Sequence, residues 1–275
     1  MAYKGYKVFA NHAHVFEDAV RPHGSIDRLK ALMEEVGIDK VVAFAPICGG
    51  PRAQLSDPDG NQNVWLANAI RDATDIIGFG TINFAKGDLR GQTEQIAELG
   101  LRGIKIHPAY QTVKVNGEQS YEVYEAAERC GLFISFHTGV HWSRLSNYAM
   151  LLFDDLTYDF PNLKFSLEHI GGHCFFKEAM AVIANRRGNA DAPHVFAGWT
   201  DIHGQGGLWS ITDEELYDLL NITGPKAQIH GLDFPYSSAD YCRAGFDRIL
   251  SLNIPEETKA RILGQNLAEA LNITL

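Results

Sequence analysis

The chain has 275 residues, of which 45% are hydrophobic and 21% are charged, a composition that is typical of a folded globular protein and excludes an intrinsically disordered one. Its 24 lysines and arginines stand against 34 acidic residues, which gives a formal net charge of −10. Because no basic cluster interrupts this balance, we expect no nucleic-acid partner, whose phosphates would require a positive surface.

Short β-branched or aromatic segments alternate along the chain with longer amphipathic segments, which is the pattern of repeated β–α units around a parallel sheet. The eight predicted strands cover residues 7–11, 40–45, 76–82, 103–106, 133–136, 164–167, 194–198 and 227–230. The predicted helices include residues 24–36, 88–99, 118–130, 177–184 and 213–220, and a final pair covers 237–250 and 255–271. Eight units without a linker favour one α/β domain over residues 1–275, a closed (β/α)8 TIM barrel with a C-terminal helical extension.

Local signals support the ends of several predicted helices. Gly37, Gly100 and Gly131 lie where helices should end, and Thr212 precedes three acidic residues, which is typical of a helix start. Two long loops, residues 47–63 and 200–210, follow the carboxyl ends of strands, where barrel enzymes place their chemistry. Each loop is interpreted either as a solvated connection or as a lid over a substrate.

The first predicted strand ends in Asn11-His12-Ala13-His14. Because side chains alternate along a strand, His12 and His14 are expected on the same side of the backbone, where two neutral imidazoles reach one cation. A single pair of histidines at this spacing is as often structural as functional. Its meaning therefore depends on the residues that end the other strands.

Later predicted strands end in similar residues: His137 in F-H-T-G, His169 in E-H-I-G-G and Asp233 in G-L-D-F-P. In a closed barrel, the carboxyl ends of all strands meet around one axis. We therefore expect side chains that are spread from residue 12 to residue 233 to converge at the mouth of the barrel.

The His12-x-His14 start, these three motifs and the terminal I-L-G-Q-N-L-A-E-A-L together resemble the amidohydrolase superfamily. More narrowly, they resemble its amidohydrolase-related branch (amidohydrolase 2) of metal-dependent TIM-barrel hydrolases, the branch that includes aminocarboxymuconate-semialdehyde decarboxylase. The similarity extends from about residue 11 to residue 271. It implies a barrel that binds metal, and it implies no particular substrate.

The resemblance implies that His12, His14, His137 and Asp233 bind one divalent metal ion. Histidine and carboxylate ligands suit zinc best, although manganese, iron and cobalt accept similar ligands. The ion would lower the pKa of water and supply hydroxide at neutral pH. Asp233 would take the proton, and His169 would polarise the substrate or move a proton, the alternative being that His169 binds a second metal.

Lys105 and His107 share one face of the fourth predicted strand, and the resemblance points that face into the barrel mouth. A buried lysine must be paired or neutral, so we interpret Lys105 as the partner of a substrate carboxylate or of a nearby acid such as Glu168. In two-metal members of the superfamily a lysine at this place is carboxylated and bridges the metals. A two-metal site with carboxylated Lys105 therefore stays open as an alternative.

Trp199 and Arg144 are the remaining candidates for substrate binding. Trp199 follows the seventh predicted strand, from which it would stack on a planar substrate, and core packing is an equal alternative. Arg144 and Arg52 lie in loops from which they would clamp a carboxylate. An ordinary solvated surface arginine is the simpler interpretation of both.

The expected function is hydrolysis of a small polar or carboxylate-bearing substrate, such as a lactone, ester or amide, by metal-activated water. The first alternative is non-oxidative decarboxylation of an aromatic or unsaturated acid, which the same ligands and histidine perform in related proteins. The second alternative is a barrel that only binds a ligand, and the presence of Asp233 and His169 argues against it. The partner would be a small-molecule substrate, and the resemblance offers a homodimer or homotetramer as the candidate assemblies.

The N-terminal segment has no long apolar core after its lysines, and no apolar stretch approaches the ~20 residues of a membrane helix. We therefore expect a cytoplasmic protein without a membrane partner. The four cysteines are far apart and include no C-x-x-C pair, so neither a zinc knuckle nor a disulfide framework is expected.

Overall fold

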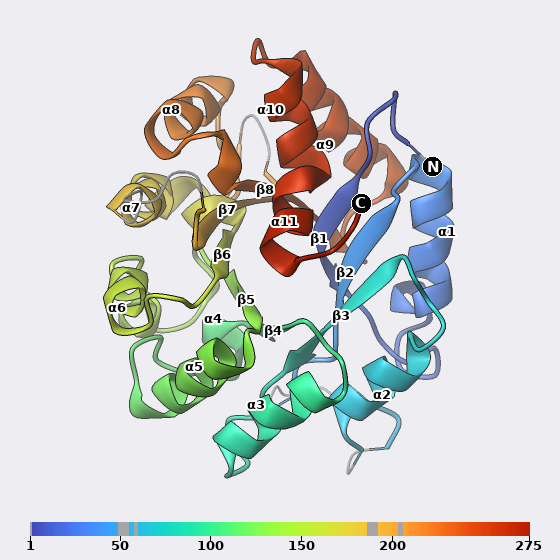
Figure 1. The fold of residues 1–275 in the computed structure, drawn as a ribbon, viewed down its shortest axis with the longest axis vertical. Helices are drawn as coiled ribbons and strands as arrows, with labels where there is room; N and C mark the ends of the chain where they lie inside the picture. The colour runs from blue at the N-terminus through green and yellow to red at the C-terminus, as the bar shows by residue number, and fades with distance from the viewer. Residues whose placement is uncertain (1, 49–54, 58–59, 186–191, 203–205) are drawn as a thin grey trace.

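The computed structural model describes residues 2–48, 55–57, 60–185, 192–202 and 206–275. Eight parallel strands pair in chain order and close into a barrel (Figure 1), which confirms the predicted fold class. The strands are β1 (Phe9–His14), β2 (Lys40–Phe44), β3 (Ile76–Thr81), β4 (Gly103–Ile106), β5 (Phe133–His137), β6 (Phe165–Glu168), β7 (Val195–Thr200) and β8 (Gln228–Phe234).

Helices surround the barrel as an outer ring (Figure 1). They are α1 (Ile26–Val36), α2 (Gln62–Ala69), α3 (Leu89–Glu98), α4 (Pro108–Gln111), α5 (Glu118–Cys130), α6 (Leu152–Asp159), α7 (Gly172–Asn185), α8 (Asp213–Thr223) and α9 (Ala239–Ser251). The C-terminal extension consists of α10 (Glu256–Ala260), the π-helical turn η6 (Arg261–Gln265) and α11 (Asn266–Leu271).

Capping explains why several helices begin and end where they do. Thr212 and Glu215 form a reciprocal capping box at the start of α8, with the Thr212 side chain accepting from the backbone of Glu215. Gly37 and Gly131 take left-handed conformations directly after α1 and α5. These positions confirm the predicted helix ends.

The last strand is longer than predicted. β8 continues four residues beyond the predicted end at residue 230, so Asp233 lies within the strand.

The amino-terminal half of the barrel interior is filled by large apolar side chains. Phe9, Phe44, Phe79, Phe133 and Phe196 belong to this cluster, and three pairs of their rings have centroids 5.7–5.9 Å apart. α11 packs its apolar face against the same cluster and covers this end of the barrel. With one end filled and covered, the polar chemistry is confined to the opposite, carboxyl end of the strands.

Among the described residues, no helix combines the length and the apolar character that a membrane crossing requires.

Gly103 in β4 provides a test of the packing inside the barrel. A Cβ atom at this position would lie 2.4 Å from the carbonyl oxygen of Phe133 and 2.7 Å from the ring of Phe79. Because the backbone of β5 cannot move without breaking the ladder, we expect Gly103→Val to lower the free energy of unfolding by about 1–3 kcal/mol or more. Urea unfolding measures this change. Gly87→Ala is the matched control, because nothing lies within 4 Å of its added Cβ, and an equal loss in both variants would contradict the packing argument.

Candidate active site

A pocket of about 490 Å3 opens at the carboxyl end of the strands. It is lined by seven polar residues of the kinds that bind metals or move protons and by a set of aromatic and other side chains. The polar residues are His12, His14, His107, His137, His141, His169 and Asp233, and the other side chains include Phe16, Arg21, Tyr110, Trp142, Trp209 and Tyr236. The predicted convergence of His12, His14, His137, His169 and Asp233 at the mouth is therefore present in the structure.

His12 and His14 meet through a β-bulge. The register of β1 against β2 shifts between Ala10 and Ala13, and His12 takes a left-handed φ of 70°. The Nε2 atoms of the two imidazoles lie 3.2 Å apart. The two rings do face one point, as expected, but an irregular strand brings them there and not the simple alternation that was predicted.

Asp233 completes a group of donors with these two histidines. Its Oδ1 lies 3.3 Å from His12 Nε2 and 3.9 Å from His14 Nε2, and all three donor atoms fall within 4.8 Å of one another. Two nitrogens 3.2 Å apart match two ligands that each lie about 2.1 Å from a common cation. Burial lowers the pKa of His12 and His14 well below the usual value, so both rings are in the neutral form that coordinates metal. The donor set therefore fits a divalent cation.

Glu168 contacts His12 at Nδ1, the ring nitrogen that points away from the donor group. This fully buried carboxylate contacts His12 Nδ1 at 3.1 Å and accepts hydrogen bonds from Asn11 Nδ2 at 2.7 Å and from the hydroxyls of Ser166 and Thr200. With Nδ1–H donating to Glu168, the lone pair of His12 Nε2 points towards the donor group. A carboxylate behind a ligating histidine fixes its tautomer and raises its basicity.

Lys105 lies beneath the pocket and does not line it. Its side chain is fully buried, with Nζ 3.3 Å from His12 Nε2 and 5.0 Å from the centre of the Phe44 ring. Burial lowers the pKa of the Lys105 amine to about 8, against the opposing attraction of Glu168 and Asp233. Lys105 is not among the residues that line the pocket, and its amine lies beside the nitrogen of His12 that faces the donor group, so its contact with a substrate stays a prediction. Its expected pairing with acids such as Glu168 agrees with this place.

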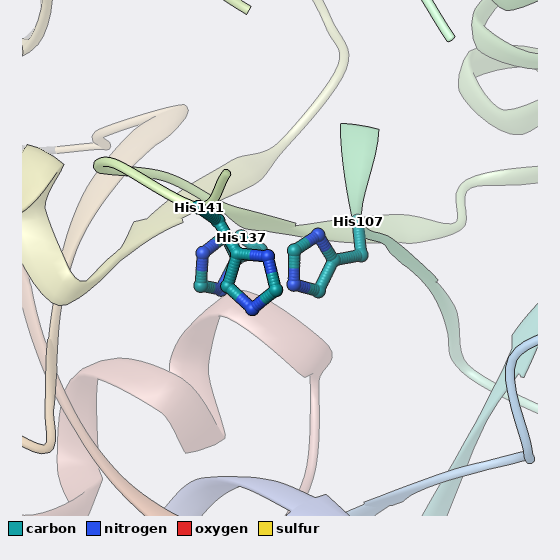
Figure 2. A group of neighbouring side chains, drawn as sticks. All are labelled: His107, His137 and His141. Carbon is teal, nitrogen blue, oxygen red and sulfur yellow. The ribbon is translucent and has the colours of Figure 1, made fainter. Parts of the chain in front are cut away.

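A second group of possible metal donors consists of His107, His137 and His141, which also line this pocket and whose side chains are drawn in Figure 2. The rings of His107 and His137 are stacked, with centroids 3.8 Å apart and planes 10° apart. The lone pair of an imidazole lies in the plane of its ring, so two parallel rings cannot both direct a lone pair at one ion without turning. Burial lowers the pKa of all three histidines, so these rings are neutral.

The structure groups His137 with His107 and His141, and not with His12, His14 and Asp233 as the resemblance implied. The Nε2 atom of His137 is buried and has no hydrogen-bond partner among the described residues, and the ring centre of His137 lies 4.8 Å from that of His169. A buried polar atom without a partner costs free energy, so this nitrogen has a role that the protein alone does not fulfil. Rotation of the His137 ring would turn Nε2 towards the group of His12, His14 and Asp233 or towards a substrate.

His169 is held in one orientation by the end of the next strand. Its Nδ1 lies 2.9 Å from the carbonyl oxygen of Thr200, to which it donates, so Nε2 carries the lone pair. Trp209 covers the ring at 4.5 Å, and burial lowers the pKa of His169 to about 3. A neutral imidazole with a fixed tautomer is suited to accept a hydrogen bond at Nε2, for example from a substrate hydroxyl.

Three of these residues have a left-handed backbone: φ is 70° at His12, 63° at His169 and 62° at Asp233. Such conformations cost of order 1–3 kcal/mol for a residue with a side chain and concentrate at functional sites. Burial, reinforced by Asp201, raises the pKa of the Asp233 carboxyl to about 7. Backbone strain and shifted pKa values thus occur together at the mouth of the barrel.

Several residues of the pocket were not predicted from the sequence. Arg21 lies in the connection after β1, donates a hydrogen bond to the Tyr236 hydroxyl at 2.9 Å and covers the Phe16 ring at 4.2 Å. Trp209 belongs to the second long loop, which therefore contributes to the pocket. Tyr236 directly follows the G-L-D-F-P motif, so its position near Asp233 could have been inferred, whereas no local signal distinguishes Arg21 from other loop arginines.

Two residues that were expected to contact the substrate, Trp199 and Arg144, are not among those that line the pocket. Gly198 and Thr200 face the barrel interior, where both meet the Glu168 side chain, so Trp199 between them points outward. Its indole donates to Gln228 at 2.9 Å, and it lines a separate cavity between the strands and the helices. Arg144 is exposed and does not line the pocket, while Arg52 lies outside the described residues.

The sequence model of the amidohydrolase family (Amidohydro_2) matches residues 12–273. The barrel, the histidines that end β1 and β5 and the aspartate that ends β8 all lie within this match. The chain is therefore a member of the amidohydrolase family.

Solved structures share the fold at low sequence identity. An uncharacterized TIM-barrel protein from Bordetella bronchiseptica is 16% identical, with a TM-score of 0.74 and coverage of 97% of this chain and 98% of the other. A 5-carboxyvanillate decarboxylase from Novosphingobium aromaticivorans, solved with bound manganese, is 16% identical, with a TM-score of 0.70 and coverage of 98% of each chain. The 2,6-dihydroxybenzoate decarboxylase from Rhizobium is 15% identical, with a TM-score of 0.66 and coverage of 97% and 99%. No curated protein sequence gives a significant match.

The metal content of purified protein tests the group of His12, His14 and Asp233. We expect one equivalent of a divalent metal per chain, and we expect His12→Ala to lose it because the variant removes one of three converging donors. Plasma mass spectrometry measures the content. His23→Ala, at an exposed histidine outside the pocket, should keep the metal. Two equivalents in the wild type would favour the alternative with carboxylated Lys105.

Glu168→Gln tests the role of the buried carboxylate behind His12. The amide keeps the size of the side chain but removes the charge that orients the imidazole, so we expect metal binding to weaken by about 10- to 100-fold. Competition with a chelator of known affinity measures the dissociation constant. An unchanged constant in a folded variant would mean that Glu168 only fills space. Glu178→Gln, at an exposed position on α7, serves as the control.

Proposed function

We propose that the chain is a metal-dependent decarboxylase of a small, planar carboxylic acid, and that hydrolysis is the second candidate. The observation that carries this proposal is the pocket itself, in which aromatic side chains face a group of histidines and one aspartate. Sequence reasoning placed hydrolysis first. The aromatic wall, which the sequence did not reveal, reverses this order.

The shape and lining of the pocket suit a flat substrate. Trp209 lies at one side against His169, while Trp142 and Tyr236 remain 83% and 64% exposed at the rim. Exposed aromatic rings beside a pocket offer apolar contact area to a planar ligand. The volume of about 490 Å3 falls within the ordinary range of small-molecule sites.

Arg21 would bind the carboxylate of the substrate or a second acidic group on it. It lines the pocket, and its contacts with Tyr236 and Phe16 hold the guanidinium at the rim. A guanidinium binds a carboxylate in a bidentate manner, which orients a planar acid as well as attracting it. Arg21 thus takes the role that the sequence suggested for Arg144.

In this proposal His12, His14 and Asp233 hold the metal, and His137 turns to add a fourth donor. When bound, the ion supplies positive charge that holds substrate oxygens and offsets the negative charge that develops on the ring. The bond between the ring carbon and the carboxylate would break, the carboxylate would leave as carbon dioxide, and the electron pair left on the ring carbon would take up a proton. Asp233 and His169 are the groups placed to hold or move that proton.

Two of the structurally similar proteins are named as decarboxylases of hydroxylated benzoates, and one of them was solved with manganese. Their low identity to this chain leaves the substrate open, but they support the same class of reaction on this fold. They also support manganese beside zinc as the resident metal, since histidine and carboxylate donors accept either ion.

Hydrolysis is supported by a different observation. The Asp233 carboxylate lies beside the donor nitrogens of His12 and His14, from where it would accept the proton of an attacking water. The lone pair of His169 Nε2 would bind the substrate across the pocket. Nothing in this arrangement requires an aromatic wall, which is why hydrolysis ranks second.

Substrate panels separate the two reactions. Metal-loaded protein is incubated with hydroxybenzoates and with lactones, while carbon dioxide release and acid release are followed in parallel. Carbon dioxide from a hydroxybenzoate, lost by about 100-fold or more in Asp233→Asn, is the expected result. Acid release from lactones alone would replace the proposal with hydrolysis, and no turnover of either panel with an intact metal site would contradict both.

Arg21→Gln tests whether Arg21 binds the carboxylate of a substrate that the wild type converts. Because the variant removes a charged hydrogen bond at a partly exposed position, we expect KM to rise by about 10-fold with little change in kcat. Steady-state kinetics measure both constants. Arg144→Gln, at the exposed arginine outside the pocket, is the matched control, and an equal effect of both variants would contradict the assignment.

A further inference from the structure

A second cavity of about 190 Å3 lies outside the barrel wall, between β7, β8 and the helices α8 and α9. Trp199 and His230, which are neighbours in the register of β7 and β8, form its wall on the side of the sheet. None of its lining residues also lines the catalytic pocket. The cavity therefore requires an explanation of its own.

The cavity contains a buried polar atom without a partner. His230 is only 6% exposed, and its Nδ1 atom has no hydrogen bond to any residue that the structure describes. Burial lowers the pKa of His230 to about 4, so the ring is neutral. An unpaired nitrogen at this depth is costly unless a ligand or a water molecule completes it.

Gly245, in the interior of α9, also lines the cavity. A Cβ at this position would meet one atom only, Cε1 of His230, at the ordinary contact distance of 3.6 Å. No steric reason thus requires glycine, although glycine in a helix interior is less stable than alanine. Because Gly245 has no side chain, the space beside Cε1 of His230, the carbon bonded to the unpaired Nδ1, is not filled by this residue.

The surroundings define the class of ligand. The Trp199 indole offers a flat apolar wall, and its N–H is already donated to Gln228. Arg248 also lines the cavity, but its guanidinium donates to Asp213 and to the carbonyl oxygens of Ile202 and Ile211, and Asp201 adds negative charge. An anionic ligand is thus disfavoured. A cavity of about 150 Å3 holds benzene in another protein, so one ring fits here.

We propose that this cavity binds a small neutral aromatic alcohol of the size of phenol, with its ring between Trp199 and Gly245 and its hydroxyl paired with His230 Nδ1. A hydroxyl group suits this nitrogen in either tautomer of the ring, because it donates and accepts. The inference does not depend on the proposed function.

Phenol binding to the metal-loaded protein tests the site. Titration is followed by the indole N–H signals of the four tryptophans, with Trp199 assigned by Trp199→Phe. We expect phenol to shift the Trp199 signal and to bind about 3- to 10-fold more tightly than benzene, which lacks the hydrogen bond. Gly245→Leu, which fills the cavity, should weaken phenol binding at least 10-fold and leave the metal content unchanged.

Three further variants make the outcome decisive. His230→Phe should abolish the preference for phenol over benzene, and Gly245→Ala should raise the unfolding midpoint, which shows that a side chain is tolerated at this position. Trp209→Ala alters the catalytic pocket and should not change the shift of the Trp199 signal. The proposal would be overturned if phenol shifted only the Trp209 signal. It would also be overturned if phenol did not bind the folded wild type while Gly245→Ala was stabilised, which would leave His230 paired with water only.

Discussion

The parallel pairing of β1 with β8 places Asn11 beside Gly231 and Ala13 beside Phe234. His12 and Asp233, which lie near opposite ends of the chain, become neighbours only through this pairing. In an open sheet the same residues would lie at opposite edges, and no donor group would exist. Gly231 makes the close approach possible, since a Cβ there would press against the Thr200 hydroxyl and lie 3.2 Å from the Cβ of His12.

Glu168 couples the fold to the site. Its carboxylate is completely buried, and it is satisfied by donors from β1, β6 and β7 rather than by water. Such a group is stable only when every partner is in place, so the same hydrogen bonds that tolerate the charge also fix His12. Gly198 belongs to this arrangement, because a Cβ at that position would lie 2.7 Å from the carboxylate. Stability and metal affinity consequently depend on the same atoms.

The barrel and the set of residues at its mouth could be predicted because they follow from repeated patterns: eight apolar strands, several of which carry a histidine or an aspartate at the carboxyl end. The details that failed depend on local irregularity. The bulge at His12 is invisible in an H-x-H motif, and the stacking of His137 on His107 depends on two side-chain rotations. The orientation of Trp199 could have been inferred, since strand alternation turns it away once Thr200 faces inward. Arg21 lies in an irregular loop, for which sequence periodicity gives no information.

The pocket combines two layers with different tolerance to change. Its floor consists of strand-borne histidines and acids that share hydrogen bonds, so most substitutions there disturb several partners at once. Its rim consists of loop-borne side chains such as Arg21, Trp142 and Tyr236, which contact few other residues and remain partly exposed. Mutations at the rim can accumulate singly, each altering which molecule enters, while the reactive group beneath stays intact. Such a division favours evolutionary diversification of substrates on one conserved chemistry, and it marks the rim as the place where laboratory selection for new specificities should begin.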